Sequence, residues 1–117
     1  MIDMITLPDV SPDMIANNLA PFEPTHPGEI IKDELEARQI TQARLAESIG
    51  VSASLVNEII RGKRGIGTEM ALLLEAAIDL PADMLLNLQN AYNKQVAKSD
   101  VSFMQRLSAI RNIAAML

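Results

Sequence analysis

Residues 41–61 read TQARLAESIGVSASLVNEIIR, and this stretch decides the fold. It predicts two short helices joined by a tight turn. Thr41 and Ser52 are residues that commonly cap helix N-termini, and Gly50 supplies the positive φ that a sharp helix exit requires. Apolar residues at spacings of one, three and four form an inward stripe on each helix: Leu45, Ala46 and Ile49, then Leu55, Val56 and Ile59. The small residue in the first stripe lets the helices cross steeply, so the pattern predicts a helix-turn-helix.

The second predicted helix, which Gly62 ends, leaves a short, polar face outside. This face carries Ser52, Ala53, Ser54, Asn57, Glu58 and Arg61. Such side chains near a helix N-terminus are suited to the major groove of DNA, where Asn57 can bond an adenine edge in two places. The alternative is a solvated face on a helical hairpin. Glu58 is awkward near phosphates, and it can read cytosine, pair with Arg61 or point away.

Basic charge is concentrated at this motif on an acidic chain. The net charge is −5, yet residues 41–64 carry four basic and two acidic residues, against six basic and thirteen acidic elsewhere. Lys63 and Arg64 lie in a glycine-rich segment suited to phosphates, although it can also be a plain charged loop. This distribution favours nucleic-acid binding at the motif. The acidic remainder suits a basic partner protein, or serves solubility alone.

The composition predicts one small all-α domain with extra segments. The chain has 117 residues, 49% of them hydrophobic, and only three are aromatic. With no cysteine, we expect neither disulfides nor thiolate metal sites, and a reducing cytosol. No basic leader precedes an apolar segment and no apolar run approaches about 20 residues, so we expect a cytoplasmic protein that does not enter a membrane.

An enzyme is the least supported class. The single histidine, His26, precedes proline and glycine without a metal-binding cluster, which predicts a loop or capping role. Carboxylates such as Asp33 and Glu36 fall on a solvated helix face. Without a nucleotide-binding loop or a nucleophile beside a base, we expect no catalytic residue, metal or cofactor.

Further helices are expected around the motif, at about residues 27–39, 68–78 and 101–117. Another is expected to begin at residue 81 or 82 and to end at residue 92, or as late as residue 98. The predicted inward positions are Ile30, Ile31 and Leu35, then Met70, Leu73, Leu74, Ala77 and Ile78, then Met84, Leu85, Leu88, Ala91 and Tyr92. Residues 1–25 are expected to be an arm with a helix start at Ser11. The last helix carries a seam of Phe103, Leu107, Ile110, Ala114 and Leu117. We favour its self-association over packing on its own domain.

The run TQ-x-x-LA-x-x-x-GVS-x-x-x-V-N resembles the phage-repressor-like (Cro/C1, or XRE) DNA-binding domains. Flanking motifs narrow the resemblance to HigA-type antitoxins, the partners of ribosome-dependent mRNA-cleaving toxins: His26–Glu29, Gly62–Ile66, Glu69–Ala71, Leu86–Gln89 and Tyr92. The match covers about residues 26–93. The chain departs from the family pattern with Gly67-Thr68 in place of Ser/Thr-Pro, Asp79 in place of glycine and Met84-Leu85 in place of Phe-Trp.

The resemblance implies a five-helix, lambda-repressor-like domain over residues 26–98, between an arm (1–25) and a C-terminal helix (99–117) for dimerisation or partner packing. It implies a homodimeric, sequence-specific repressor that binds operator DNA, regulates its own operon and neutralises a HigB-like toxin. The expected DNA-binding residues are Thr41, Gln42, Arg44, Ser52, Ala53, Ser54, Asn57, Arg61, Lys63 and Arg64. The alternatives are a free-standing regulator without a toxin, and a protein-interaction module that has lost DNA binding.

Overall fold

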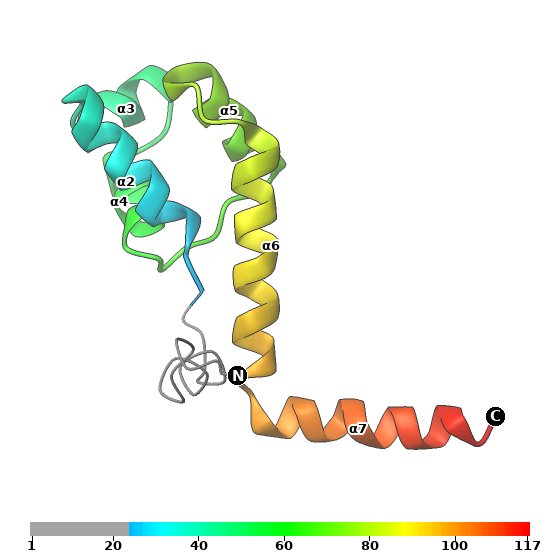
Figure 1. Cartoon of the computed structure of the whole chain (residues 1–117). Coiled ribbons are helices and arrows are strands. Elements are labelled where there is room, and N and C mark those ends of the chain that lie inside the picture. Colours follow the sequence, from blue (N-terminus) through cyan, green and yellow to red (C-terminus); the bar gives the residue numbers. More distant parts are fainter. Residues whose placement is uncertain (1–23) are drawn as a thin grey trace, which may run out of the picture.

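A computed structural model describes residues 24–117, which form six α-helices and no strand (Figure 1). In chain order the helices are α2 (Pro27–Arg38), α3 (Gln42–Ile49), α4 (Ala53–Ile60), α5 (Thr68–Ile78), α6 (Ala82–Lys98) and α7 (Val101–Ala115). The all-α prediction is confirmed, and the predicted helix ends agree to within about two residues. The predicted arm falls outside the described residues except for its last two positions. Within the described part, no helix is long and apolar enough to cross a membrane.

The helix ends follow from local capping chemistry. Thr41 Oγ1 accepts a hydrogen bond from the N–H of Arg44 at 3.0 Å, and Ser52 Oγ accepts one from Leu55 at 3.1 Å. Gly50 ends α3 with a φ of 78°. All three predicted caps are therefore confirmed. Asp79 ends α5 with a φ of 62°, so this residue adopts the left-handed conformation in which the family commonly has glycine.

His26 is the cap of α2, in agreement with the capping role that the sequence predicts. Its Nδ1 accepts a hydrogen bond from the N–H of Gly28 at 2.9 Å, and the side chain is 5% exposed. Its ring meets the ring of Tyr92 edge-on, with the centroids 4.8 Å apart. The cap therefore also joins the start of α2 to α6.

Helices α2 to α6 enclose one core, to which each of them contributes. The buried apolar residues are Ile31, Leu35, Leu45, Ala46, Val56, Ile59, Ile66, Ala71, Leu74, Ile78, Leu80, Ala82 and Leu85. Helix α2 crosses the end of α4 closely: a Cβ added at Gly28 would lie 2.1 Å from the carbonyl oxygen of Ile59. Only glycine permits this approach, which fixes the orientation of α4.

The predicted inward stripes of α5 and α6 are partly wrong. Leu73 is 38% exposed and Met84 is 37% exposed, and the predicted Ala77 and Ala91 are also exposed. Helix α5 instead turns the edge formed by Ala71, Leu74 and Ile78 toward the core. Apolar residues surround much of α5, so spacing alone does not determine which side its neighbours cover.

Helix α7 begins at the C-terminal end of α6, turns away from it and points away from the five-helix body (Figure 1). None of its residues is buried, and only Met104 and Leu107 are half-buried. The Cα radius of gyration is 19.7 Å, against about 13 Å for a compact domain of roughly this length. In the single chain, the predicted seam of α7 is therefore open to solvent except at Leu107.

Candidate nucleic-acid interface

Helix α4 lies across α3 and presents its first turn to solvent. Val56 and Ile59 anchor it in the core, while Ser52, Ala53 and Ser54 are exposed at its start. Ser52 Oγ accepts from the backbone of Leu55, which leaves its hydroxyl hydrogen available for a further acceptor. The first turn of α4 is thus a small, polar protrusion.

A side-chain hydrogen bond joins the two helices of the motif. Asn57 Nδ2 donates to Gln42 Oε1 at 3.1 Å, and both side chains are half-buried. This contact ties the start of α3 to the middle of α4. Asn57 keeps its Oδ1 and a second N–H for other partners, since an amide has two donors and one acceptor oxygen.

Three basic residues follow α4 on the exposed side. Arg61, Lys63 and Arg64 are all exposed, and the N–H of Lys63 closes the helix end by donating to the carbonyl oxygen of Glu58 at 2.9 Å. Gly62 turns the chain there with a φ of 75°. The turn places the basic loop directly beside the C-terminal end of α4.

Glu58 pairs with Arg64 rather than with Arg61, the arginine considered for it from the sequence. Arg64 Nε lies 2.9 Å from Glu58 Oε1, and both side chains are about half exposed. Such a pair is worth little to stability in water. It does hold one arginine of the loop against the end of α4.

Gln89 on α6 supports this loop, and the expected site residues do not include it. Its Oε1 accepts a hydrogen bond from the N–H of Ile66 at 2.9 Å, and its Nε2 donates to Asn93 Oδ1 at 2.9 Å. The side chain is 7% exposed. A Cβ added at Gly65 would lie 3.0 Å from Gln89 Nε2, so the glycine gives room for this contact. The available signal was a polar residue within the otherwise apolar stripe of α6.

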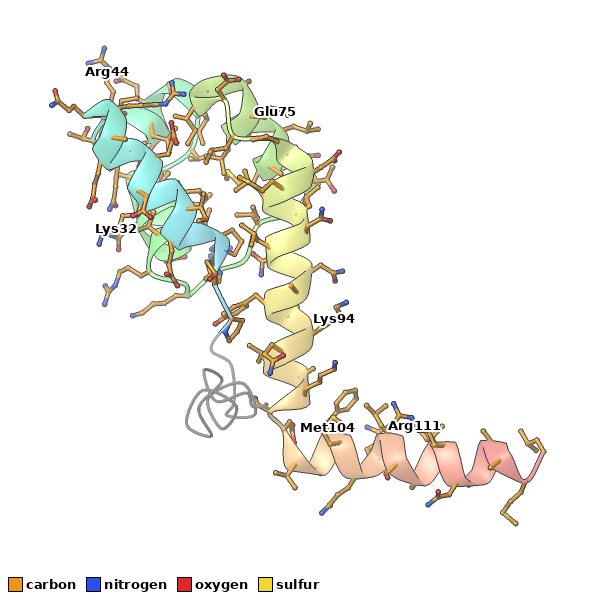
Figure 2. All side chains as sticks on the ribbon, in the orientation of Figure 1. Lys32, Arg44, Glu75, Lys94, Met104 and Arg111 are labelled. Carbon is orange, nitrogen blue, oxygen red and sulfur yellow. The ribbon has the colours of Figure 1, made fainter. Side chains whose placement is uncertain are left out.

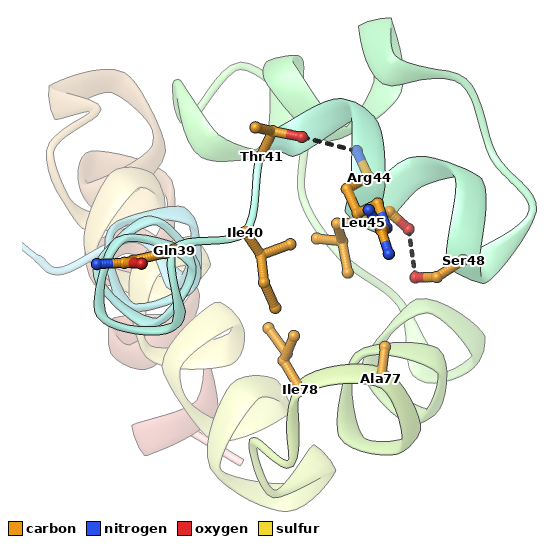
Figure 3. A pocket seen from close by; sticks show the side chains of 8 residues that line it. All are labelled: Gln39, Ile40, Thr41, Arg44, Leu45, Ser48, Ala77 and Ile78. Carbon is orange, nitrogen blue, oxygen red and sulfur yellow. Dashed lines mark hydrogen bonds between the residues drawn. The ribbon is translucent and has the colours of Figure 1, made fainter.

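Arg44 lies apart from the other basic residues. It lines an open groove of about 440 Å³ between α3 and the end of α5 (Figure 3), and it is the only charged side chain of the lining. Thr41, Leu45 and Ala77 belong to the same lining. Of the ten expected DNA-binding residues, Gln42 and Asn57 are half-buried and the other eight are exposed.

The comparisons with known proteins agree with this geometry. Residues 31–85 match the helix-turn-helix family HTH_3. The chain is 40% identical to the virulence-associated protein I of Dichelobacter nodosus over 76 residues, which are 64% of this chain and 70% of that protein.

Two solved structures from Pseudomonas aeruginosa are similar to the fold. The protein PA4674, in complex with its operator DNA, is 39% identical, with a TM-score of 0.63 over 71% of this chain and 91% of that one. The antitoxin HigA, with the higBA promoter, is 43% identical, with a TM-score of 0.62 over 65% of this chain and 84% of that one.

Proposed function

We propose that this chain, which belongs to the helix-turn-helix family HTH_3 of XRE type, is the antitoxin of a toxin–antitoxin pair and represses its own operon. Members of this family are DNA-binding regulators and not a class of enzymes, and this chain is such a regulator. Beyond this, we propose that the chain recognises an operator, acts as a homodimer and binds a toxin.

The observation that carries the DNA-binding role is the exposed first turn of α4 beside a basic loop. Ser52, Ser54 and Asn57 offer donors and acceptors that match base edges in the major groove. Lys63 and Arg64 lie in the exposed loop after the end of α4, where they can contact phosphates on the groove's edge. In this proposal Ala53 touches a thymine methyl, Gln42 braces Asn57, and Thr41, Arg44 and Arg61 complete the backbone contacts.

The short length of α4 supports operator recognition by a homodimer. One eight-residue helix reads only a few base pairs. Two copies with their α4 helices about 34 Å apart would read two half-sites separated by one turn of DNA, as an inverted repeat. The resulting affinity would exceed that of either half-site alone.

Binding of operator DNA can be tested with the DNA upstream of the gene, by fluorescence anisotropy at several salt concentrations. Asn57→Ala should reduce the preference for the operator over random DNA by about 1–3 kcal/mol, because one base contact is lost. Lys63→Ala should weaken binding to both DNAs equally and lower the salt slope by about one. An unchanged preference in the first variant would remove Asn57 from base readout.

The antitoxin role rests on the similarity to HigA over most of the folded body and on the acidic surface outside the DNA-binding face. Its test is a pull-down of the tagged chain from its native cell after nuclease treatment. A small basic protein recovered in stoichiometric amount would support the HigB-like partner. Recovery of the bait alone, with its promoter DNA in an untreated sample, would favour a free-standing regulator.

A further inference from the structure

Helix α5 carries an apolar face that no other part of the described chain covers. Leu72 is 52% exposed and Leu73 is 38% exposed. Together with Glu69 they line an open depression of about 310 Å³. Ala76, one helical turn from both leucines, is also exposed. We refer to Glu69, Leu72, Leu73 and Ala76 as the α5 face.

The surroundings of the α5 face are acidic. No lysine or arginine occurs between Arg64 and Lys94, whereas this segment contains Glu69, Glu75, Asp79 and Asp83, all exposed. Glu75 also accepts a hydrogen bond from the N–H of Ala82 at 3.1 Å, which holds its carboxylate at the junction of α5 and α6. A partner for this face should therefore be apolar and basic.

Helix α7 has this chemistry. Its exposed apolar residues include Phe103, Ile110 and Ile113, which are 37%, 54% and 62% exposed. Arg106 and Arg111 are its only charged residues, so the helix is basic along its whole length. A 15-residue helix without a packed face is marginal in water, so α7 needs a partner to be stable.

Within one chain the two surfaces are far apart. Figure 2 shows Glu75 of α5 near one end of α6 and Arg111 of α7 beyond the other end. Helix α6 has 17 residues, which corresponds to a length of about 25 Å. Helix α7 therefore cannot cover the α5 face of its own chain, but it can reach that of another copy.

We propose that α7 of one copy docks on the α5 face of a second copy, and that the exchange is reciprocal. This inference rests on the dimer of the proposed function and names its contact. Leu72 and Leu73 would be covered by the seam of α7, while Arg106 and Arg111 would face the acidic rim. Two α7 helices packed on each other would instead bring these arginines together without an acidic partner on either helix, which is unfavourable.

The cysteine-free chain allows a direct test by thiol cross-linking. One full-length copy carries Ala76→Cys and a second, distinguished by a larger tag, carries Ala114→Cys. Both positions are exposed and small, so cysteine should be tolerated there. A short bismaleimide added to the mixture should give mainly the mixed dimer. Ala37→Cys, exposed on α2, replaces Ala76→Cys as the matched control and should give none.

The other outcomes of this experiment would identify which part of the proposal fails. Cross-linking mainly between two Ala114→Cys copies would overturn the proposal in favour of α7 against α7. A dimer by sedimentation with no mixed product would overturn this contact alone. A monomer by sedimentation would overturn the dimer of the proposed function as well.

Charge reversal supplies a second, independent measurement. Arg106→Glu with Arg111→Glu should raise the dimer dissociation constant several-fold, and so should Glu69→Lys with Asp83→Lys. In the mixed dimer both contacts pair opposite charges, one as in the unaltered protein and one with the charges exchanged, so mixing the two variants should recover association between unlike copies. If the variant with Glu69→Lys and Asp83→Lys dimerises like the unaltered protein, the α5 face is not the docking surface.

Discussion

At the scale of single residues, two polar side chains of the candidate interface bond to another side chain of the protein and are also accessible to solvent. Asn57 is shared between Gln42 and solvent, and Arg64 is shared between Glu58 and solvent. In our proposal both contacts hold a group that faces DNA in place before DNA binds. Pre-ordering lowers the entropy that binding must overcome, but a carboxylate beside an arginine that is proposed to bind phosphate also opposes the phosphate.

Glu58→Gln should therefore increase the affinity for all DNA sequences, because it frees Arg64 and removes a negative charge near the backbone. The slope of log K against log salt should become steeper by up to about one. Glu47→Gln removes the same charge from the exposed surface of α3 without releasing Arg64, and it serves as the control. Equal slopes in the two variants would mean that the ion pair does not restrain Arg64.

At the scale of elements, the position of α4 depends on how closely α2 crosses it. Gly28 lies against the carbonyl oxygen of Ile59 in the last turn of α4, and His26 caps the first turn of α2 beside it. The reading helix is thus supported from behind by a short segment that itself makes no contact with DNA in our proposal.

Gly28→Ala should destabilise the fold by at least about 2 kcal/mol, because its Cβ cannot be placed without moving backbone. Gly67→Ala is the matched control, since nothing lies within 4 Å of its Cβ and its φ is −104°. Because Gly67 is the N-cap of α5, where alanine is less favourable than glycine, the control should cost less than about 1 kcal/mol. Urea unfolding followed by circular dichroism measures both, and equal midpoints would contradict the close crossing.

The cap of α2 also predicts a dependence on pH. Burial lowers the pKa of His26 from its ordinary value of 6.5, with the charge of Glu29 opposing the shift. As the pH falls through about 6.5 the unfolded chain takes up a proton first, so stability present above this pH is lost below it. Protonation also removes the lone pair that caps α2.

The free energy of unfolding should accordingly decrease between pH 7.5 and 5.5 in the unaltered protein. His26→Asn keeps a capping oxygen but cannot titrate, so its unfolding free energy should be nearly flat over this range. The same slope in both proteins would assign the pH dependence to another group.

Local signals in the sequence predicted the helices and their ends well. They did not predict contacts between residues that are far apart in the sequence. Thr41, Gly50 and Ser52 act within four residues of their own position, so the motif could be read directly. Gln89 bonds a backbone group 23 residues away, and no local pattern indicates such a partner. Leu73 and Met84 were misplaced because the covered side of α5 and α6 depends on the neighbouring helices.

At the scale of the whole molecule, the folded body and α7 are separable. Every buried apolar residue of the core lies between Ile31 and Leu85, and α7 contributes none. The body should therefore fold without the last helix. The association of copies should depend on it.

Deleting residues 101–117 should leave the thermal midpoint of the body within a few degrees and shift the sedimentation profile from dimer to monomer. Affinity for a single half-site should be unchanged, whereas affinity for the inverted repeat should fall because the two half-sites are no longer linked. A persistent dimer would show that the copies associate through another surface.

The contact of Gln89 with the loop after α4 has a consequence for communication between sites. Helix α6 holds the basic loop through the bond of Gln89 to Ile66, and it continues, one turn later, through Asn93 toward α7. A ligand that displaces Gln89 would loosen Lys63 and Arg64 without approaching the DNA. Thermodynamic reciprocity then requires that operator DNA and such a ligand alter each other's affinity by the same factor. The side-chain amide of Gln89 would then couple ligand binding at α6 to the release of operator DNA.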